Sequence, residues 1–117
     1  MEKHARDAKT GLVYHGYDES WQQAWADPDT RRSPKFWGQA VGWYFMALVE
    51  TLDIFPSTHI TKLNNLVAIL QRLVEAVVKV QDPTKGVCRW EVLDQGGRQG
   101  NYLEYSALCM FIYGLYL

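Results

Sequence analysis

The arrangement of apolar and polar residues predicts a first helix over residues 34–52. Apolar side chains surround this segment instead of forming one stripe, which is typical of a helix buried on most sides. Ser33 can cap its N-terminus, and Pro34 suits its first position. Pro56 disfavours a helical conformation at Phe55 and therefore ends the helix. We expect an inner helix of a larger all-α fold.

The next segment, residues 58–81, has a different pattern. Ser57 can cap its N-terminus, and Asp82-Pro83 marks its end. Polar residues occupy most of the remaining positions, so an amphipathic outer helix is predicted. Its apolar residues recur at three- and four-residue spacing: Ile60, Leu63, Val67, Leu70, Val74, Val77 and Val78.

The last predicted helix begins near residue 102, and apolar residues again cover most of its circumference. It follows a glycine-rich loop, residues 96–101, whose glycines are mis-spaced for a dinucleotide fingerprint. Short extended segments are expected at residues 11–17 and 87–93, within and beyond a loop-rich region that occupies residues 1–33.

The alternation of fully apolar and amphipathic helices indicates an all-α fold in which one ring of helices packs inside another. This is the arrangement of an α/α barrel, and residues 1–117 would form one part of it. The final helix ends at Leu117 without a charged last turn, a glycine or a proline. We therefore expect residues 1–117 to be a barrel fragment that is truncated at both ends.

Net charge and hydropathy exclude several classes of partner. The formal net charge is -1 and the basic residues are scattered, so no nucleic-acid partner is expected. No segment approaches the ~20 apolar residues of a membrane helix, and the polar N-terminus does not resemble a signal peptide. We therefore predict no membrane partner and a cytoplasmic location.

The cysteines and histidines do not form a recognisable metal motif. Cys88 and Cys109 lie in apolar contexts and are interpreted as small buried side chains, although a disulfide stays open. His4, His15 and His59 are far apart and lack the spacing of metal ligands. No metal site is predicted.

Three sequence blocks, in this order and spacing, resemble a known enzyme family. They are residues 14–20 (YHGYDES) with 25–27 (WAD), residues 33–44 (SPKFWGQAVGWY), and residues 92–95 (VLDQ) with 100–107 (GNYLEYSA). The chain resembles the unsaturated rhamnogalacturonyl hydrolases and the related unsaturated glucuronyl hydrolases, glycoside hydrolase families 105 and 88. The similarity spans nearly all of the chain, and the block at 33–44 is the most specific.

The resemblance implies a complete six-hairpin, (α/α)6 barrel that acts on unsaturated uronyl oligosaccharides such as those from rhamnogalacturonan in pectin. In that reaction a carboxylic acid protonates the C4=C5 double bond of a 4,5-unsaturated uronic acid. Water then adds at C5, and the resulting hemiketal rearranges so that the glycosidic link breaks. The chemistry implies neither a metal nor an organic cofactor.

The resemblance also implies which residues face the sugar. The family's principal aspartate lies upstream of the histidine block and has no counterpart here, so no catalytic residue is assigned. His15 matches the histidine near the active site, Gln39 stands where the family usually carries arginine, and Trp43 matches a tryptophan four positions later. We predict these three as substrate-binding residues. The alternative is a structural hydrogen bond for His15 and core packing for Trp43.

Two carboxylates are further candidates for the sugar-binding cleft. Asp18 lies in the histidine block, where loop hydrogen bonding is the simpler interpretation. Glu104 begins the last helix, where a carboxylate also stabilises the helix N-terminus. Trp25, Trp37 and Trp90 are interpreted as packing residues.

Two functions of different classes follow. The first is a glycoside hydrolase fragment that binds sugar and is inactive alone. The alternative is a non-catalytic carbohydrate-binding or interaction module derived from such a barrel. In either case, exposed faces of the inner helices predict self-association.

Overall fold

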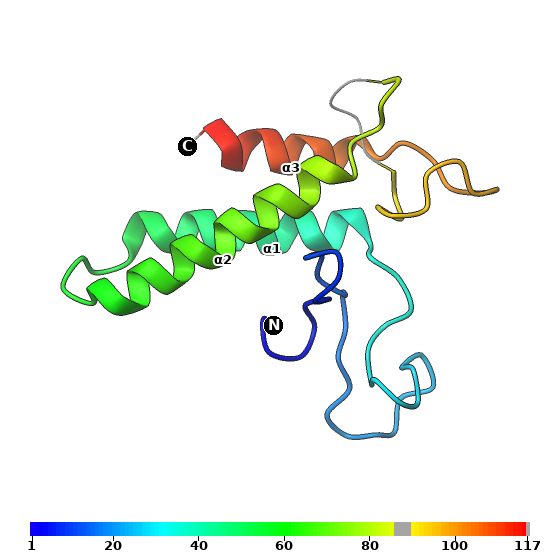
Figure 1. The fold of residues 1–117 in the computed structure, drawn as a ribbon, viewed down its shortest axis with the longest axis horizontal. Coiled ribbons are helices and arrows are strands. Elements are labelled where there is room, and N and C mark those ends of the chain that lie inside the picture. Colours follow the sequence, from blue (N-terminus) through cyan, green and yellow to red (C-terminus); the bar gives the residue numbers. More distant parts are fainter. Residues whose placement is uncertain (86–89, 117) are drawn as a thin grey trace.

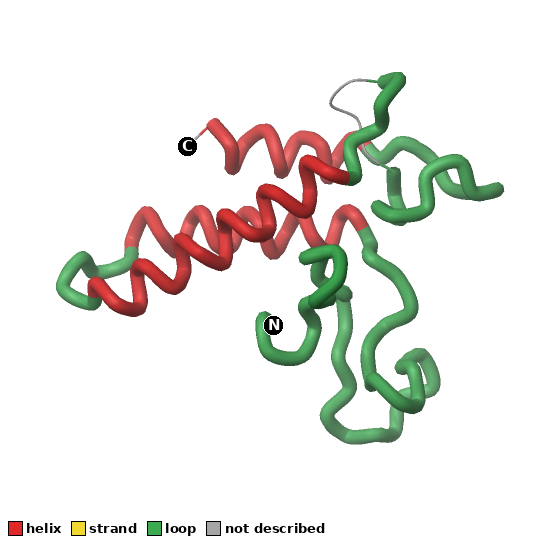
Figure 2. Tube along the Cα trace, viewed as in Figure 1, coloured by secondary structure: helices red, strands yellow, loops and turns green. Residues whose placement is uncertain are grey.

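The computed structural model describes residues 1–85 and 90–116 and contains three α-helices. These are α1 (Gly38–Ile54), α2 (Ile60–Lys79) and α3 (Tyr105–Tyr116), shown in Figure 1. Outside the helices, the described residues form loops with isolated β-bridges and no extended strand (Figure 2). The prediction of an all-α fold is confirmed.

Helices α1 and α3 run in the same direction, and α2 runs back along α1 in the opposite direction (Figure 1). Helix α1 packs against both others, whereas the backbones of α2 and α3 do not approach each other closely. Two parallel helices and one antiparallel return helix are the repeating unit expected of a barrel with an inner and an outer ring.

Two glycines lie where α1 and α3 pack closely together. A Cβ atom at Gly42 would lie 2.7 Å from the sulfur of Met110, and one at Gly114 would overlap the ring of Phe45. Phe45 also packs edge-on against Phe111, with ring centroids 5.6 Å apart. The missing side chains therefore let the two helix backbones come together.

The core extends from the helices to the N-terminal loop. It includes Leu73 and Ala76 of α2, together with Leu12 and Val13 of the loop. Outside this core, Glu2 forms ion pairs with Arg6 and Arg72, but such half-exposed pairs add little stability. The apolar contacts, more than these charges, fix the loop on α2 and α1.

The helix starts differ from the prediction. Helix α1 begins at Gly38, four residues after Pro34, and no side chain caps it. Ser33 instead joins two loops: its hydroxyl accepts a hydrogen bond from the Gly16 N–H at 3.2 Å. The N–H of Gly38 donates to the carbonyl of Glu91 at 2.7 Å, so a distant loop performs the capping.

Helix α1 ends at Ile54, two residues beyond its predicted limit, whereas α2 lies within its predicted bounds and α3 begins later than predicted. Helix α2 begins at Ile60 with no side-chain cap, so the prediction of Ser57 as its N-cap was wrong. Helix α3 begins at Tyr105, after a turn in which Glu104 supplies the cap. At α3 the Glu104 carboxylate accepts from the N–H groups of Ser106 and Ala107, so the helix begins directly after this residue.

The faces of α1 and α3 that point away from the core are exposed in this chain. Trp43 is 60% exposed, which corrects the prediction that α1 is buried on most sides. Cys109 is exposed and free, so its prediction as a buried side chain was wrong, while Cys88 lies outside the described residues. None of the described helices is long and apolar enough to cross a membrane.

Candidate functional site

The N-terminal ends of α1 and α3 meet at a group of paired loops. Trp37 forms an antiparallel bridge with Val92, and Trp90 forms another with Leu103. The N–H of Leu93 donates to the carbonyl of Phe36 at 3.0 Å. Backbone hydrogen bonds therefore hold together the segments that precede the two helices.

A pocket of about 210 Å³ lies where these loops meet the histidine block. His15 and Trp37 form part of its wall, with their rings nearly perpendicular and their centroids 6.0 Å apart. The His15 Nδ1 atom lies 3.2 Å from the carbonyl oxygen of Lys35. The full lining is His15, Lys35, Trp37, Glu91, Val92 and Arg98.

The carbonyl contact fixes the chemistry that His15 can offer. A carbonyl oxygen only accepts hydrogen bonds, so this contact requires a proton on Nδ1. In the neutral ring, Nε2 then carries a lone pair that can accept a hydrogen bond from a hydroxyl group. This is a suitable contact for a sugar, which presents many hydroxyl donors.

Two of the predicted site residues, Gln39 and Glu104, are linked through Ser106. The Gln39 amide donates to the Ser106 hydroxyl at 3.4 Å, and that hydroxyl donates to the Glu104 carboxylate at 2.8 Å. These contacts connect the first turn of α1 to the start of α3.

Glu104 caps α3. Its carboxylate accepts hydrogen bonds from the N–H groups of Ser106 at 3.1 Å and Ala107 at 2.7 Å. Partial burial favours the neutral acid, but these N–H groups and the Ser106 hydroxyl outweigh it and lower the pKa of Glu104. Its carboxylate is therefore ionised and engaged in holding the helix.

Asp18 organises its own loop. Its buried carboxylate accepts hydrogen bonds from the Ser20 hydroxyl at 2.6 Å and from the N–H groups of Gln22 and Gln23. The Ser20 hydroxyl and these N–H groups lower the pKa of Asp18 despite the cost of burial. All of these partners are local, as in an Asx-type loop.

Trp43 lies one helical turn after Gln39 and does not line the pocket that contains His15. The described structure therefore places His15 in the pocket, Gln39 and Glu104 in the adjoining hydrogen-bonded chain, and Trp43 on an exposed face of α1. Asp18 stays in its own loop.

Sequence reasoning missed part of the pocket. Trp37, which the sequence predicts as a packing residue, is 40% exposed and lies beside His15. Arg98 belongs to the glycine-rich loop, for which the sequence predicted no ligand site, and it lines the pocket. Asn101 shapes that loop by donating to the carbonyls of Val92 and Gln95 at 3.1 and 2.8 Å. The sequence signal that could have indicated a fixed loop around Arg98 was an asparagine at the end of a glycine-rich segment.

The described residues contain no cluster of three or more histidine, cysteine or acidic side chains suited to a metal ion.

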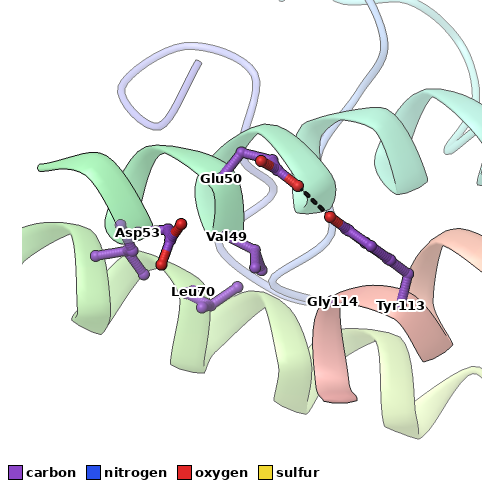
Figure 3. A pocket seen from close by; sticks show the side chains of 7 residues that line it. Val49, Glu50, Asp53, Leu70, Tyr113 and Gly114 are labelled. Atoms are coloured by element: carbon purple, nitrogen blue, oxygen red, sulfur yellow. Dashed lines mark hydrogen bonds between the residues drawn. The ribbon is translucent and has the colours of Figure 1, made fainter. Parts of the chain in front are cut away.

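A second, larger pocket lies at the opposite end of the helix pair. It has a volume of about 490 Å³, and the Tyr113 hydroxyl donates a hydrogen bond to Glu50 across it (Figure 3). That bond is the largest cause of the raised pKa of Tyr113. None of the predicted site residues lines this pocket, whose lining is Val49, Glu50, Leu52, Asp53, Leu70, Tyr113 and Gly114.

Comparison with known proteins gives consistent matches. The sequence profile of Glycosyl Hydrolase Family 88 matches residues 1–117. Protein Atu3128 of Agrobacterium fabrum and the 24.9 kDa protein in the picA locus of Rhizobium radiobacter are each 44% identical over 105 residues. The chain spans 43% of the length of these curated relatives, and the matches cover 90% of this chain.

Solved structures give the same fold. A family 105 glycoside hydrolase from C. acetobutylicum is 47% identical and superposes with a TM-score of 0.92 over 97% of this chain, which covers 31% of that structure. A possible family 105 member from Salmonella enterica serovar Paratyphi A is 24% identical, with a TM-score of 0.74 and coverage of 97% and 27%. The second likeness concerns the fold alone. The chain is therefore similar to one part of a larger helical protein.

Proposed function

Because the chain belongs to Glycosyl Hydrolase Family 88, we propose that it supplies part of the sugar-binding cleft of a glycoside hydrolase. The substrates are 4,5-unsaturated uronyl oligosaccharides, such as those released from the rhamnogalacturonan of pectin. The reaction is hydration of the double bond: a carboxylic acid donates a proton to the alkene and water adds at C5.

The observation that carries this proposal is the pocket of His15 and Trp37 at the joined N-terminal ends of α1 and α3. An indole face packs well against the C–H groups of a sugar, while a neutral imidazole accepts from a hydroxyl. Gln39 lies in the adjoining chain of hydrogen bonds and can exchange its Ser106 contact for a sugar hydroxyl. Trp43 extends the same helix face outwards.

We also propose that this chain alone does not turn over substrate. A general acid near neutral pH needs a raised pKa. The five described carboxyl groups whose pKa is shifted all have it lowered, because hydrogen bonds hold each as an anion; they are Asp7, Asp18, Asp27, Asp82 and Glu104. The sites that sequence motifs favoured, Asp18 and Glu104, therefore suit a structural role better than proton donation.

The test combines turnover and binding with one ligand. The purified chain is incubated with an unsaturated galacturonyl-rhamnose disaccharide while the alkene absorbance is followed, and binding is measured by ligand-observed NMR. We expect binding without loss of the alkene, and weaker binding by His15→Ala. Clear turnover would contradict the proposal that this chain alone is inactive, and no binding would contradict the sugar-cleft proposal. Glu19→Gln, in an exposed loop position, serves as the control.

A second candidate is a non-catalytic interaction module, favoured by the exposed apolar side chains of the inner helices. Trp43, Ile112 and Leu115 are each at least 45% exposed. Sedimentation velocity tests whether these faces drive self-association. A concentration-dependent dimer supports this candidate, while a compact monomer at all concentrations counts against it.

A further inference from the structure

We infer that Arg98 and Lys35 form a carboxylate-binding subsite in the pocket of His15 and Trp37, and that Arg98 determines the preference for an acidic sugar. This inference rests on the proposed function and adds residues that the motif comparison did not supply. It concerns recognition of the acid group and assigns no proton transfer.

The loop that carries Arg98 is fixed from both sides. The Arg98 N–H donates to the carbonyl of Gln95 at 3.2 Å, and its own carbonyl accepts from the Asn101 N–H at 3.0 Å. Asn101 also donates to Gln95 and Val92 through its side chain. A short loop held by this many hydrogen bonds presents the guanidinium to the pocket with little loss of backbone freedom on binding.

Both cations remain available for a ligand. Among the described residues, neither Arg98 nor Lys35 forms an ion pair, whereas Glu2 engages Arg6 and Arg72. Arg98 is exposed and Lys35 is partly exposed. A guanidinium can bind a carboxylate through two parallel hydrogen bonds, and an ammonium adds a further point charge.

The pocket also contains one opposing charge. Glu91 lines it together with the two cations, so the side chains of these three residues carry a net charge of +1 near neutral pH. The Glu91 carbonyl accepts a hydrogen bond from the Gly38 N–H, and the Glu91 N–H donates to the Tyr102 carbonyl. These bonds fix the position of the Glu91 Cα atom, from which its side chain extends. A ligand carboxylate is therefore attracted by Arg98 and Lys35 and repelled by Glu91, and Glu91 can accept a sugar hydroxyl.

The remaining walls favour a sugar acid over an inorganic anion. Trp37 offers an aromatic surface, and His15 offers an acceptor at Nε2. A bare anion would use only the cations, whereas an unsaturated uronyl residue has a carboxylate, hydroxyl groups and a flat carbon face. A volume of about 210 Å³ suits one monosaccharide unit more closely than a chain of several.

The experiment compares two ligands that differ by one charge. Binding of an unsaturated galacturonyl-rhamnose disaccharide and of its methyl ester is measured by NMR titration at low ionic strength. The chain and the variants Arg98→Gln, Lys35→Gln and Glu91→Gln are compared, with circular dichroism as a check on folding. Lys62→Gln, an exposed position on α2, is the matched control for loss of one positive charge.

We expect the free acid to bind about tenfold more tightly than the ester, because a charge-assisted hydrogen bond contributes more to binding than a neutral one. Arg98→Gln removes most of this preference, Lys35→Gln removes less, and both leave ester binding unchanged. Glu91→Gln increases the preference, a change that a merely structural role would not produce. Lys62→Gln retains the original preference, and added salt reduces it.

The outcomes separate this inference from the proposed function. Equal binding of acid and ester, or a preference that survives Arg98→Gln, would overturn the subsite while the sugar cleft stands. Binding of neither ligand by the unmodified chain would overturn the proposed function, and the subsite with it.

Discussion

The two ends of the α1–α3 pair are built in different ways. At the N-terminal end, the Gln39–Ser106–Glu104 chain and the bridge between Trp37 and Val92 connect both helices to loops. At the C-terminal end, the contacts between the helices are mainly apolar, and the polar contact there is the exposed bond of Tyr113 to Glu50.

This difference indicates which contacts position the pocket residues and which contacts stabilise the helix pair. Directional hydrogen bonds at the N-terminal end fix the positions of pocket residues, whereas apolar packing farther along the helices provides most of the stability. The following substitutions test that division of roles, in order of decreasing expected effect.

The largest effect is expected at the centre of the helix pair. Phe45 is 1% exposed and contacts Phe111, so Phe45→Ala should lower the free energy of unfolding by about 3–5 kcal/mol. Trp43→Ala, on the exposed face of the same helix, should cost less than about 1 kcal/mol. Urea denaturation measures both. Equal losses would show that the exposed face is packed in solution.

The next prediction compares the two glycines. Gly114→Ala should destabilise by about 1–3 kcal/mol, because the new methyl group overlaps the rigid ring of Phe45. Gly42→Ala meets the flexible side chain of Met110, which can move while the helix gains from alanine. Gly42→Ala should therefore be closer to neutral by the same measurement. A larger loss of stability for Gly42→Ala than for Gly114→Ala would show that the less adaptable contact is the one between Gly42 and Met110.

The third prediction concerns the cap at the N-terminal end. Glu104→Gln should reduce stability by about 1 kcal/mol near neutral pH, because an amide replaces an ionised cap. The folded-state pKa of Glu104 is lowered, so its stabilisation is present above the unfolded-state pKa and disappears as pH falls through the folded-state pKa. Urea midpoints across acidic pH should converge for chain and variant. Glu19→Gln, in an exposed loop, is the control.

The smallest effect is expected for the polar contact at the C-terminal end. Tyr113→Phe should leave the urea midpoint unchanged within error, because both groups of the bond are exposed. It should remove one phenol that ionises above the usual range, as the Glu50 bond raises the pKa of Tyr113. Alkaline absorbance titration detects this loss, with Tyr116→Phe as control. A clear drop in stability would contradict the contrast between the two ends.

The sequence predicted the three helices, their order and the amphipathic character of α2, because hydrophobic periodicity distinguishes helices from loops. It did not predict burial residue by residue: Ile60, Val67 and Val78 of the predicted apolar stripe are exposed. It placed the start of α1 at Pro34, since local capping rules cannot include the carbonyl of Glu91, which is distant in the chain. Contacts between residues far apart in sequence decide such boundaries.

The candidate site was predicted in part. The motif comparison indicated His15 and Gln39, and both lie at the joined loops. It did not indicate Arg98, whose proximity to His15 depends on the path of a glycine-rich loop closed by Asn101. The sequence motifs also did not show that the carboxylates of Asp18 and Glu104 accept hydrogen bonds from nearby backbone N–H groups. The roles of His15, Gln39, Asp18 and Glu104 as substrate contacts stay predictions.

The central position of α1 also implies an order of local opening. Helix α1 contacts both α2 and α3, whereas those two helices lack close backbone contact with each other. Detachment of α2 would therefore leave the α1–α3 contacts in place, but opening of α1 would disrupt both pairs. In native-state hydrogen exchange, the buried amides of α1 should be the last to exchange, and those of the exposed N-terminal half of α2 should be among the first of the helical amides.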